Sequence, residues 1–291
     1  MMPKREWIHA WLLLLPAFVF LIAFTHLPAV QTLIDSFWST PKGRRPAVFV
    51  GGDNYARMLA DPILAKALWN SAVYAALTIP ASVVLALAMA LLVQARFAGV
   101  ALMRMAFFTP TVLPLIAVAN IWLFFYAPGF GLIDQIRGLF GLPSVNLAGQ
   151  PETALYAVAA VTVWKEAGFF MVFYLAALQA VPPALREAAA IEGCGRWTFF
   201  RRVTLPLIMP TTLFVTVNAT INAFRLVDHV FVMTRGGPDN ATMLLLYYVF
   251  ENGFRYWDTA YAAALTILLV AILTVVGLGQ FFAADRRVHY R

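Results

Sequence analysis

Six long apolar runs constrain the fold of this chain more than any other feature of its sequence. Each run has the roughly 20 mainly apolar residues that a helix needs to cross a lipid bilayer. The runs cover residues 8–34, 68–94, 102–126, 153–180, 207–233 and 260–284. Of the 291 residues, 62% are hydrophobic and 12% charged, whereas soluble domains have about 45–50% and about 25%. The sequence therefore predicts an all-α integral membrane protein with six transmembrane helices.

Prolines occur inside several of these runs, and the first run stands close to the N-terminus. Neighbouring helices of a bundle satisfy the backbone groups that a proline frees, so we expect the prolines to be tolerated. They are Pro16, Pro28, Pro80, Pro110, Pro114 and Pro210. No small-residue cleavage site follows the first run at the distance typical of a signal peptide, so we interpret this run as a retained span.

The distribution of basic residues predicts the topology. An even number of spans puts both termini on one side, and the loops and termini on that side carry eleven basic residues: Lys4, Arg5, Arg96, Arg104, Arg186, Arg196, Arg201, Arg202, Arg286, Arg287 and Arg291. The opposite loops carry eight: Lys42, Arg44, Arg45, Arg57, Lys66, Arg137, Arg235 and Arg255. The positive-inside rule then favours cytoplasmic termini. These scattered charges form no basic, aromatic-interleaved face for nucleic acid. The single cysteine, Cys194, cannot form an internal disulfide.

A polar stretch between the fourth and fifth runs, residues 181–206, predicts a short helix outside the bilayer. Pro182 and Pro183 end the preceding helix, because neither has an N–H and both crowd the turn before them. Residues 184–192 are rich in strong helix formers, and Gly193 and Gly195 are placed to end the helix. We expect this helix to lie along the membrane surface, where it could enter a groove on another protein.

The same stretch resembles the EAA loop of ABC-importer permeases, through Glu187-Ala188-Ala189, Gly193 and Leu205-Pro206. In that family the loop is the coupling helix that docks into a cleft of a cytoplasmic ATPase. The resemblance implies the following ATPase-coupling residues: Arg186, Glu187, Ala188, Ala189, Glu192, Gly193, Leu205 and Pro206. Glu192, Cys194 and Val203 depart mildly from the family pattern, and the alternative is an ordinary amphipathic loop helix.

The resemblance extends over nearly the whole chain. It includes Trp164-Lys165 through Gln179, Phe224 to Asp228, the Gly236-Gly237-Pro238 turn, Asn54-Tyr55 and Phe130 to Ile133. The chain is similar to the first permease of carbohydrate importers of type I, the maltose or glycerol-3-phosphate type. This resemblance implies an inner-membrane heterodimer with a second permease, an ABC ATPase dimer and an extracytoplasmic solute-binding protein.

The expected organisation has three parts. Residues 1–67 form an N-terminal span followed by a compact extracytoplasmic loop, since residues 35–67 are rich in the turn formers Gly, Asp, Asn and Pro. Residues 68–284 form the permease core, with the coupling loop at 182–206, and residues 285–291 form a cytoplasmic tail.

Polar residues inside the spans predict a solute pathway. On an ideal helix, one polar stripe about 27 Å long would contain Thr211, Asn218, Asn222, Arg225 and His229. Asp228 is within reach of Arg225. Polar groups at this depth usually face a cavity or a partner, and Lys165 and Glu166 lie midway along the fourth span. The predicted pathway residues are Asn120, Trp164, Lys165, Glu166, Asn218, Asn222, Arg225 and Asp228, with Tyr126 nearby. The alternative is that the charged groups only join helices through salt bridges.

Motifs that would make this chain an enzyme do not occur in its sequence. It has no phosphate-binding G-x-x-x-x-G-K-[ST] loop, no H-E-x-x-H and no nucleophile elbow. We therefore expect no cofactor and no metal site on this chain, with ATP and Mg²⁺ held by the partner ATPase. The leading hypothesis is a permease that forms half of the pathway for a sugar or polyol. The alternatives are a glycerol-3-phosphate importer of the same family, and an ion-coupled carrier with Glu166, Arg225 and Asp228 as its relay.

Overall fold

The computed structural model describes residues 4–95 and 97–285, and the predicted cytoplasmic tail therefore lies almost wholly outside the described residues. The described part of the chain is helical, and its only β-type pairings are two isolated bridges, Trp38 with Phe49 and Lys42 with Arg45. The chain forms two compact units. Unit 1 contains the described residues up to Asp61 and residues Val249–Ala271, and unit 2 contains Pro62–Tyr248 and the described residues from Ile272 onward.

Among the described residues, four helical segments are long and apolar enough to cross a membrane. The first, Trp11–Asp35, consists of the second part of α1 (Lys4–Leu21), the π-turn η1 (Ile22–His26) and α2 (Leu27–Asp35). The others are α4 (Pro62–Val93), α8 (Pro151–Gln179) and residues Thr259–Phe282 of α15 (Thr259–Asp285). Two bent helix pairs raise the number to as many as six. The predicted all-α membrane fold is thus confirmed, with six as the upper number of spans.

The predicted third span is broken rather than continuous. It consists of α5 (Val100–Val112) and α6 (Leu115–Phe125), whose axes differ by 106°. The break follows from Pro114, because a proline disfavours the helical conformation of the residue before it. Leu113 is accordingly extended, with ψ of 136°. The expectation that Pro114 would be tolerated within one helix was wrong.

The fifth apolar segment begins at Arg196, before the predicted bounds of 207–233, and is also broken. Its first part contains α10 (Arg196–Phe199), the π-turn η2 (Phe200–Thr204) and α11 (Leu205–Leu207), and it meets the second part at a bend of 67°. The second part is itself divided into α12 (Met209–Arg225) and α13 (Asp228–Met233), since Leu226 is extended with ψ of 106°. The prediction of one helix over 207–233 was therefore wrong.

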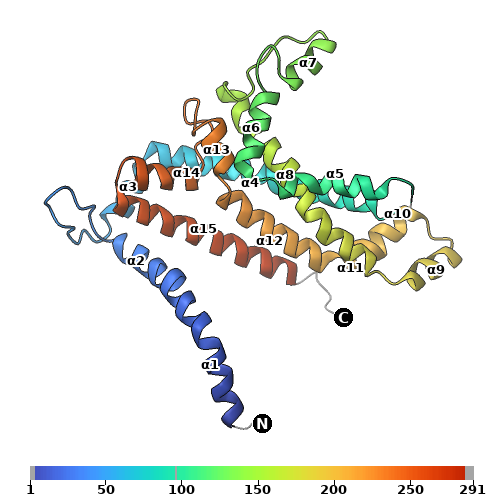
Figure 1. Cartoon of the computed structure of the whole chain (residues 1–291), viewed down its shortest axis with the longest axis horizontal. Coiled ribbons are helices and arrows are strands. Elements are labelled where there is room, and N and C mark those ends of the chain that lie inside the picture. The colour runs from blue at the N-terminus through green and yellow to red at the C-terminus, as the bar shows by residue number, and fades with distance from the viewer. Residues whose placement is uncertain (1–3, 96, 286–291) are drawn as a thin grey trace. The chain divides into compact units, whose positions relative to one another are not determined.

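Unit 2 is built around α4, α8 and α12, which pack through a core of small and aromatic side chains (Figure 1). Ala86 and Ala90 of α4 meet Phe170 and Tyr174 of α8 and Val215 of α12 in this core. Small residues at such interfaces let helix backbones approach closely, which is the main source of helix association in lipid. The remaining helices are short: α3 (Asp53–Leu59), α7 (Leu132–Leu139), α9 (Pro183–Ile191), α14 (Leu245–Phe250) and the π-turn η3 (Glu251–Arg255).

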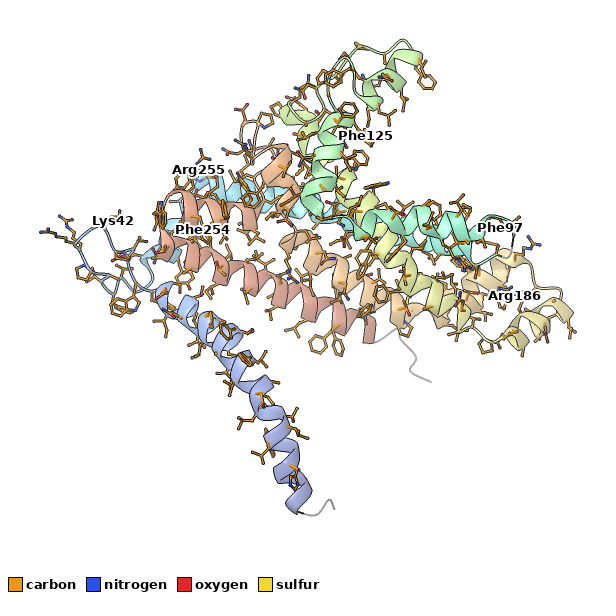
Figure 2. The ribbon with its side chains drawn as sticks, in the orientation of Figure 1. Lys42, Phe97, Phe125, Arg186, Phe254 and Arg255 are labelled. Carbon is orange, nitrogen blue, oxygen red and sulfur yellow. The ribbon has the colours of Figure 1, made fainter. Side chains whose placement is uncertain are left out.

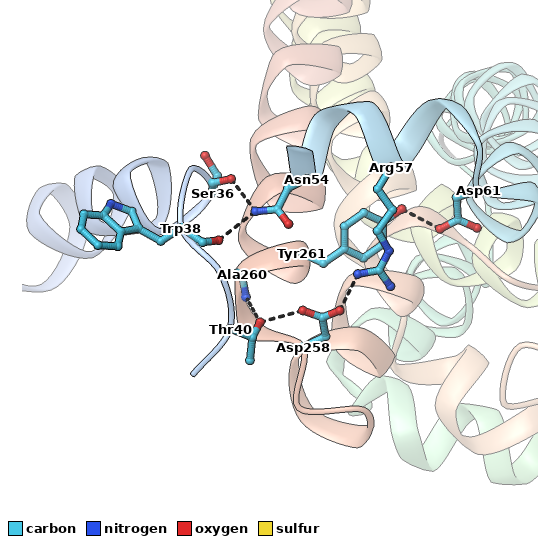
Figure 3. Close-up of polar contacts among 9 residues, drawn as sticks. All are labelled: Ser36, Trp38, Thr40, Asn54, Arg57, Asp61, Asp258, Ala260 and Tyr261. Atoms are coloured by element: carbon cyan, nitrogen blue, oxygen red, sulfur yellow. Dashed lines mark hydrogen bonds and ion pairs between the residues drawn. The ribbon is translucent and has the colours of Figure 1, made fainter. Parts of the chain in front are cut away.

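In unit 1, a polar network joins the loop after α2 to the start of α15 (Figure 3). Thr40 Oγ1 donates to Asp258 Oδ1 at 2.7 Å and accepts from the Ala260 N–H at 3.0 Å. Arg57 Nη1 lies 2.6 Å from Asp258 Oδ2, and the guanidinium stacks 3.9 Å from the centre of the Tyr261 ring. This part of the chain contains one short helix, α3, and its loop is held to α15 by the polar network.

The Asp258 carboxylate is the acceptor at the centre of this network. Burial by itself raises the pKa of Asp258, but hydrogen bonds from Thr40 and Arg57, together with the charge of Arg57, outweigh burial and hold this pKa below its ordinary value. The network is therefore stronger when Asp258 is ionised.

Substitution Thr40→Val should loosen the loop of unit 1. Valine has the shape of threonine but leaves Asp258 without one donor and the Ala260 N–H without its acceptor, at a cost of about 1 kcal/mol. We expect amide exchange at Ala260 to accelerate about fivefold, measured by hydrogen–deuterium exchange on the purified protein. Thr32→Val is the matched control, because Thr32 Oγ1 only donates to Pro28 O within its own helix. Equal exchange at Ala260 in the two variants would contradict this role of Thr40.

The same loop should open as the pH falls. The folded-state pKa of Asp258 lies below its unfolded value, so its stabilising contribution is complete above about pH 4 and is lost as the pH falls through the folded pKa. Protection factors of residues 38–50 and 258–260, which already correct for the pH dependence of intrinsic exchange, should therefore decline below about pH 4. In Asp258→Asn, which cannot ionise, they should be low and independent of pH over this range.

Candidate functional site

The short helix predicted at residues 184–192 is present as α9, one residue earlier at each end than its sequence indicated. Pro183 occupies the first turn, where its missing N–H costs nothing. Gly193 ends the helix with a φ of +67°, and the Cys194 N–H donates to Ala189 O at 2.8 Å. Apart from the two chain neighbours of Gly193, no atom of the described residues lies within 4 Å of a Cβ placed on this glycine. Within this chain, therefore, glycine is needed at this position for its backbone conformation and not for space.

Helix α9 is exposed and lies at the end of unit 2 where α8 ends and α10 and α11 begin (Figure 1). Its face with Arg186, Ala189 and Ala190 lines a cavity of unit 2. At 100° per residue, Glu187, Ala188 and Ile191 lie on the opposite face. The Ile191 side chain is 88% exposed. The outward face of α9 is therefore free to enter a groove on a partner.

The charged residues of α8 point to different neighbours. The buried Glu166 accepts from Asn222 Nδ2 of α12 at 2.6 Å. Lys165 Nζ instead donates to three main-chain carbonyls, those of Pro110 at 3.2 Å, Thr111 at 3.2 Å and Leu113 at 2.8 Å. The sequence had predicted that Lys165 and Glu166 wall the same cavity. In the structure they instead contact different helices.

Lys165 supports the break between α5 and α6. The last carbonyls of α5 lose their helical partners where the helix stops at Pro114. An ammonium has three N–H donors, and Lys165 uses them on three of these carbonyls. Its positive charge also suits the negative end of α5. This lysine is therefore bound to backbone and is not available for a salt bridge.

The polar stripe predicted for the fifth span is divided by the break after α12. His229 of α13 is fully buried, and its Nε2 lies 2.9 Å from Tyr74 Oη and 3.1 Å from Thr162 Oγ1. Asn218 is half-buried and donates to Phe214 O in its own helix, while Arg225 is exposed. In the described part of the chain, Arg225 and Asp228 do not form the predicted ion pair. The expectation of one continuous polar stripe was therefore wrong.

The other predicted pathway residues lie around α6. Trp164 packs edge-on against Trp122, with ring centroids 5.6 Å apart. Asn120 is exposed and donates to Ile116 O, and Tyr126 is buried and donates to Ala157 O at 3.0 Å. No described contact links these residues to Asn222 or Arg225, so the structure does not gather the predicted residues into one cavity of this chain.

A polar row on α4 was missed by the sequence analysis. Asn70, Tyr74, Thr78 and Ser82 are spaced four residues apart, lie on one face of the helix and are all buried. Asn70 Nδ2 donates to Asn240 O at 2.8 Å, and Tyr74 contacts Thr162 and His229. The spacing of four was the signal that could have revealed this face.

Substitution Lys165→Met should destabilise the bundle by about 2 kcal/mol, because it leaves buried carbonyls without donors. The measurement is the thermal melting of the purified importer complex. Lys66→Met is the matched control, since Lys66 is exposed and donates to the single carbonyl of Asp239. A change at such a surface site should stay within about 0.5 kcal/mol. If both variants melt alike, the support of the α5–α6 break by Lys165 is refuted.

Comparisons with known proteins agree with this architecture. Residues 79–290 match the family model of the binding-protein-dependent transport system inner membrane component. The chain also resembles the crystal structure of a bacterial alginate ABC transporter in complex with an alginate pentasaccharide-bound periplasmic protein. The TM-score is 0.86 at 22% identity, covering 97% of this chain and 96% of the other.

Several characterised permeases are similar over most of their length. The sulfoquinovosyl glycerol transport system permease SmoG of Agrobacterium fabrum is 31% identical, covering 90% of this chain and 86% of that protein. The sn-glycerol-3-phosphate permease UgpA of Salmonella typhimurium is 30% identical, covering 99% and 97%. The trehalose/maltose permease MalF of Thermococcus litoralis is 32% identical, covering 95% of each chain. This chain therefore belongs to the family of binding-protein-dependent transport system inner membrane components, as a multi-pass inner-membrane permease of an ABC importer.

Proposed function

We propose that this chain forms half of a pathway for a sugar or polyol and that α9 couples it to a partner ATPase. The observation that carries the proposal is the placement of α9. It is exposed, it follows α8 after a short link at Ala180–Pro182, and it is joined through α10, η2 and α11 to α12. A displacement of α9 is therefore transmitted directly to the two helices that carry Glu166 and Asn222.

We assign ATP hydrolysis, the energy source of transport, to the partner ATPase. ATP and Mg²⁺ bind to the ATPase dimer, and this chain supplies no residue that handles nucleotide. Closure of the ATPase dimer displaces α9, with Glu187 paired to a basic residue of the ATPase cleft. Because α8 and α12 are joined by the Glu166–Asn222 hydrogen bond, they rock together and switch the access of the pathway. The second permease supplies the other wall.

The topology of unit 2 supports cytoplasmic coupling. Figure 2 shows Arg186 of α9 and Phe97 of the α4–α5 loop at the same end of this unit. Both loops are thus on one side of the membrane, and their arginines follow the positive-inside rule. We infer that this side is the cytoplasm and that both termini face it, with the loop of unit 1 outside, on the side of the binding protein.

A neutral cargo is favoured over a phosphate. Of the two intramembrane cations that could attract an anion, Lys165 is bound to three carbonyls, which leaves Arg225. Among similar proteins, LacF of Rhizobium radiobacter is a lactose permease, while UgpA is a permease for sn-glycerol 3-phosphate. A binding assay on the partner binding protein, across sugars, polyols and glycerol phosphates, identifies the cargo.

An ion-coupled carrier has less support from the geometry. It needs a linked path of titratable groups, with Glu166, Arg225 and Asp228 as the candidates. Glu166 is bonded to Asn222, and neither Arg225 nor Asp228 is linked to it by a described hydrogen bond or ion pair. We therefore favour the ATPase-coupled permease.

Substitution Glu187→Lys or Gly193→Asp should uncouple ATP hydrolysis from uptake. Glu187→Lys places like charges in the ATPase interface, and Gly193→Asp adds a charged side chain at a position of positive φ. We expect uptake by the reconstituted complex to fall about tenfold or more while the protein stays folded. Glu152→Lys is the control, because it makes the same charge reversal at the start of α8. Unchanged uptake in the α9 variants would contradict the coupling role.

A further inference from the structure

A cavity in the described part of unit 2 lies on the face of α9 opposite Glu187. Its volume is about 760 Å³, within the range of small-molecule sites. It lies between the inner face of α9, the C-terminal end of α4 and the segment from Cys194 to Thr204. The outward face of α9, which carries Glu187, is not part of it, whereas Arg186, one of the coupling residues that the resemblance implies, lines it.

The lining of this cavity combines apolar and cationic residues. Leu91, Leu178 and Phe199 provide apolar surface, and Trp197 stacks on Phe200 with ring centroids 5.7 Å apart. Two guanidinium groups, those of Arg186 and Arg196, line the cavity, and no Asp or Glu does. Within the described residues, neither arginine has an ion pair or a hydrogen bond. The cavity therefore combines two uncompensated positive charges with an apolar wall.

The position of the cavity indicates which molecule fits it. It lies where α4 and α8 end, and the ends of membrane-spanning helices come close to the lipid headgroups. Basic pockets between helices at this level suit the phosphate of anionic lipids. A free phosphate would satisfy the arginines but leave the apolar wall in contact with water. A phospholipid satisfies both, through its phosphate diester and the first part of an acyl chain.

We propose that this cavity binds an anionic phospholipid of the inner leaflet, with its phosphate between Arg186 and Arg196 and its acyl chain against Leu91, Leu178 and Phe199. The bound lipid bridges α9 to the end of α4. It therefore stiffens the connection of α9 to the bundle, through which the partner ATPase acts, whatever cargo the importer carries.

Lipid retention by the complete importer tests the proposal. The complex is purified in mild detergent, incubated with equal amounts of phosphatidylglycerol and phosphatidylcholine, and analysed by native mass spectrometry. We expect the wild type to retain phosphatidylglycerol over phosphatidylcholine. The double variant R186Q/R196Q should lose about 25-fold in this preference, because each of the two basic groups near an anionic lipid contributes a factor of about five.

The control variant is R201Q/R202Q, which removes the same charge from the same loop, at residues that do not line the cavity. It should retain phosphatidylglycerol like the wild type. If both double variants lost the preference for phosphatidylglycerol equally, the lipid would be held by a general attraction to basic residues, and the proposed site would be overturned. A wild type without preference, or displacement of the lipid by millimolar inorganic phosphate, would also overturn it.

This readout is separate from coupling. Glu187→Lys, on the opposite face of α9, should uncouple uptake but keep the lipid. If Glu187→Lys leaves uptake unchanged while R186Q/R196Q loses phosphatidylglycerol, the coupling role fails and the lipid site stands. If the lipid leaves when the ATPase is added to the permease pair, the cavity belongs to the ATPase interface and the lipid proposal is overturned.

Discussion

The close packing of α4 against α8 is the constraint on which unit 2 depends. In lipid there is no hydrophobic effect to drive apolar helices together, so small side chains and buried hydrogen bonds must hold them. Ala86 and Ala90 bring the backbones close, and Tyr74 joins Thr162 to His229 between them. Through His229 the same contact positions α13, and through Glu166 and Asn222 it positions α12. Helices α4, α8, α12 and α13 are therefore held together by buried polar contacts.

The broken third span shows how irregular backbone is kept inside a membrane protein. Free carbonyls facing lipid would cost several kcal/mol each, so they are found only where the protein supplies donors. Lys165 supplies three N–H groups to the end of α5. Gly168, one turn later, allows α8 to approach α5 so closely that a Cβ there would lie 2.2 Å from Phe107 O. The face of α8 with Lys165 and Gly168 thus stabilises the break between α5 and α6. The adjacent face, with Glu166, binds α12.

The coupling loop joins these helices of unit 2 to the outside of the bundle. Its helix is free on the face with Glu187 and lines a cationic, apolar cavity on the other, so the two faces suit two different contacts. A partner ATPase on one face and a lipid on the other would act on the same short lever. The polar network of Thr40, Arg57 and Asp258 anchors the loop of unit 1 in a similar way, by charged hydrogen bonds rather than by apolar burial.

Local patterns determined much of this protein. The apolar runs indicated a helical membrane fold, and the prolines and glycines around Glu187 indicated α9, because hydropathy and backbone chemistry act within one segment. The partners of the polar side chains depended on tertiary structure. Residues at neighbouring positions, such as Lys165 and Glu166, point 100° apart on a helix and meet different helices. Which helix each meets depends on the tertiary structure, in which Lys165 binds carbonyls at the end of α5 and Glu166 binds Asn222 of α12.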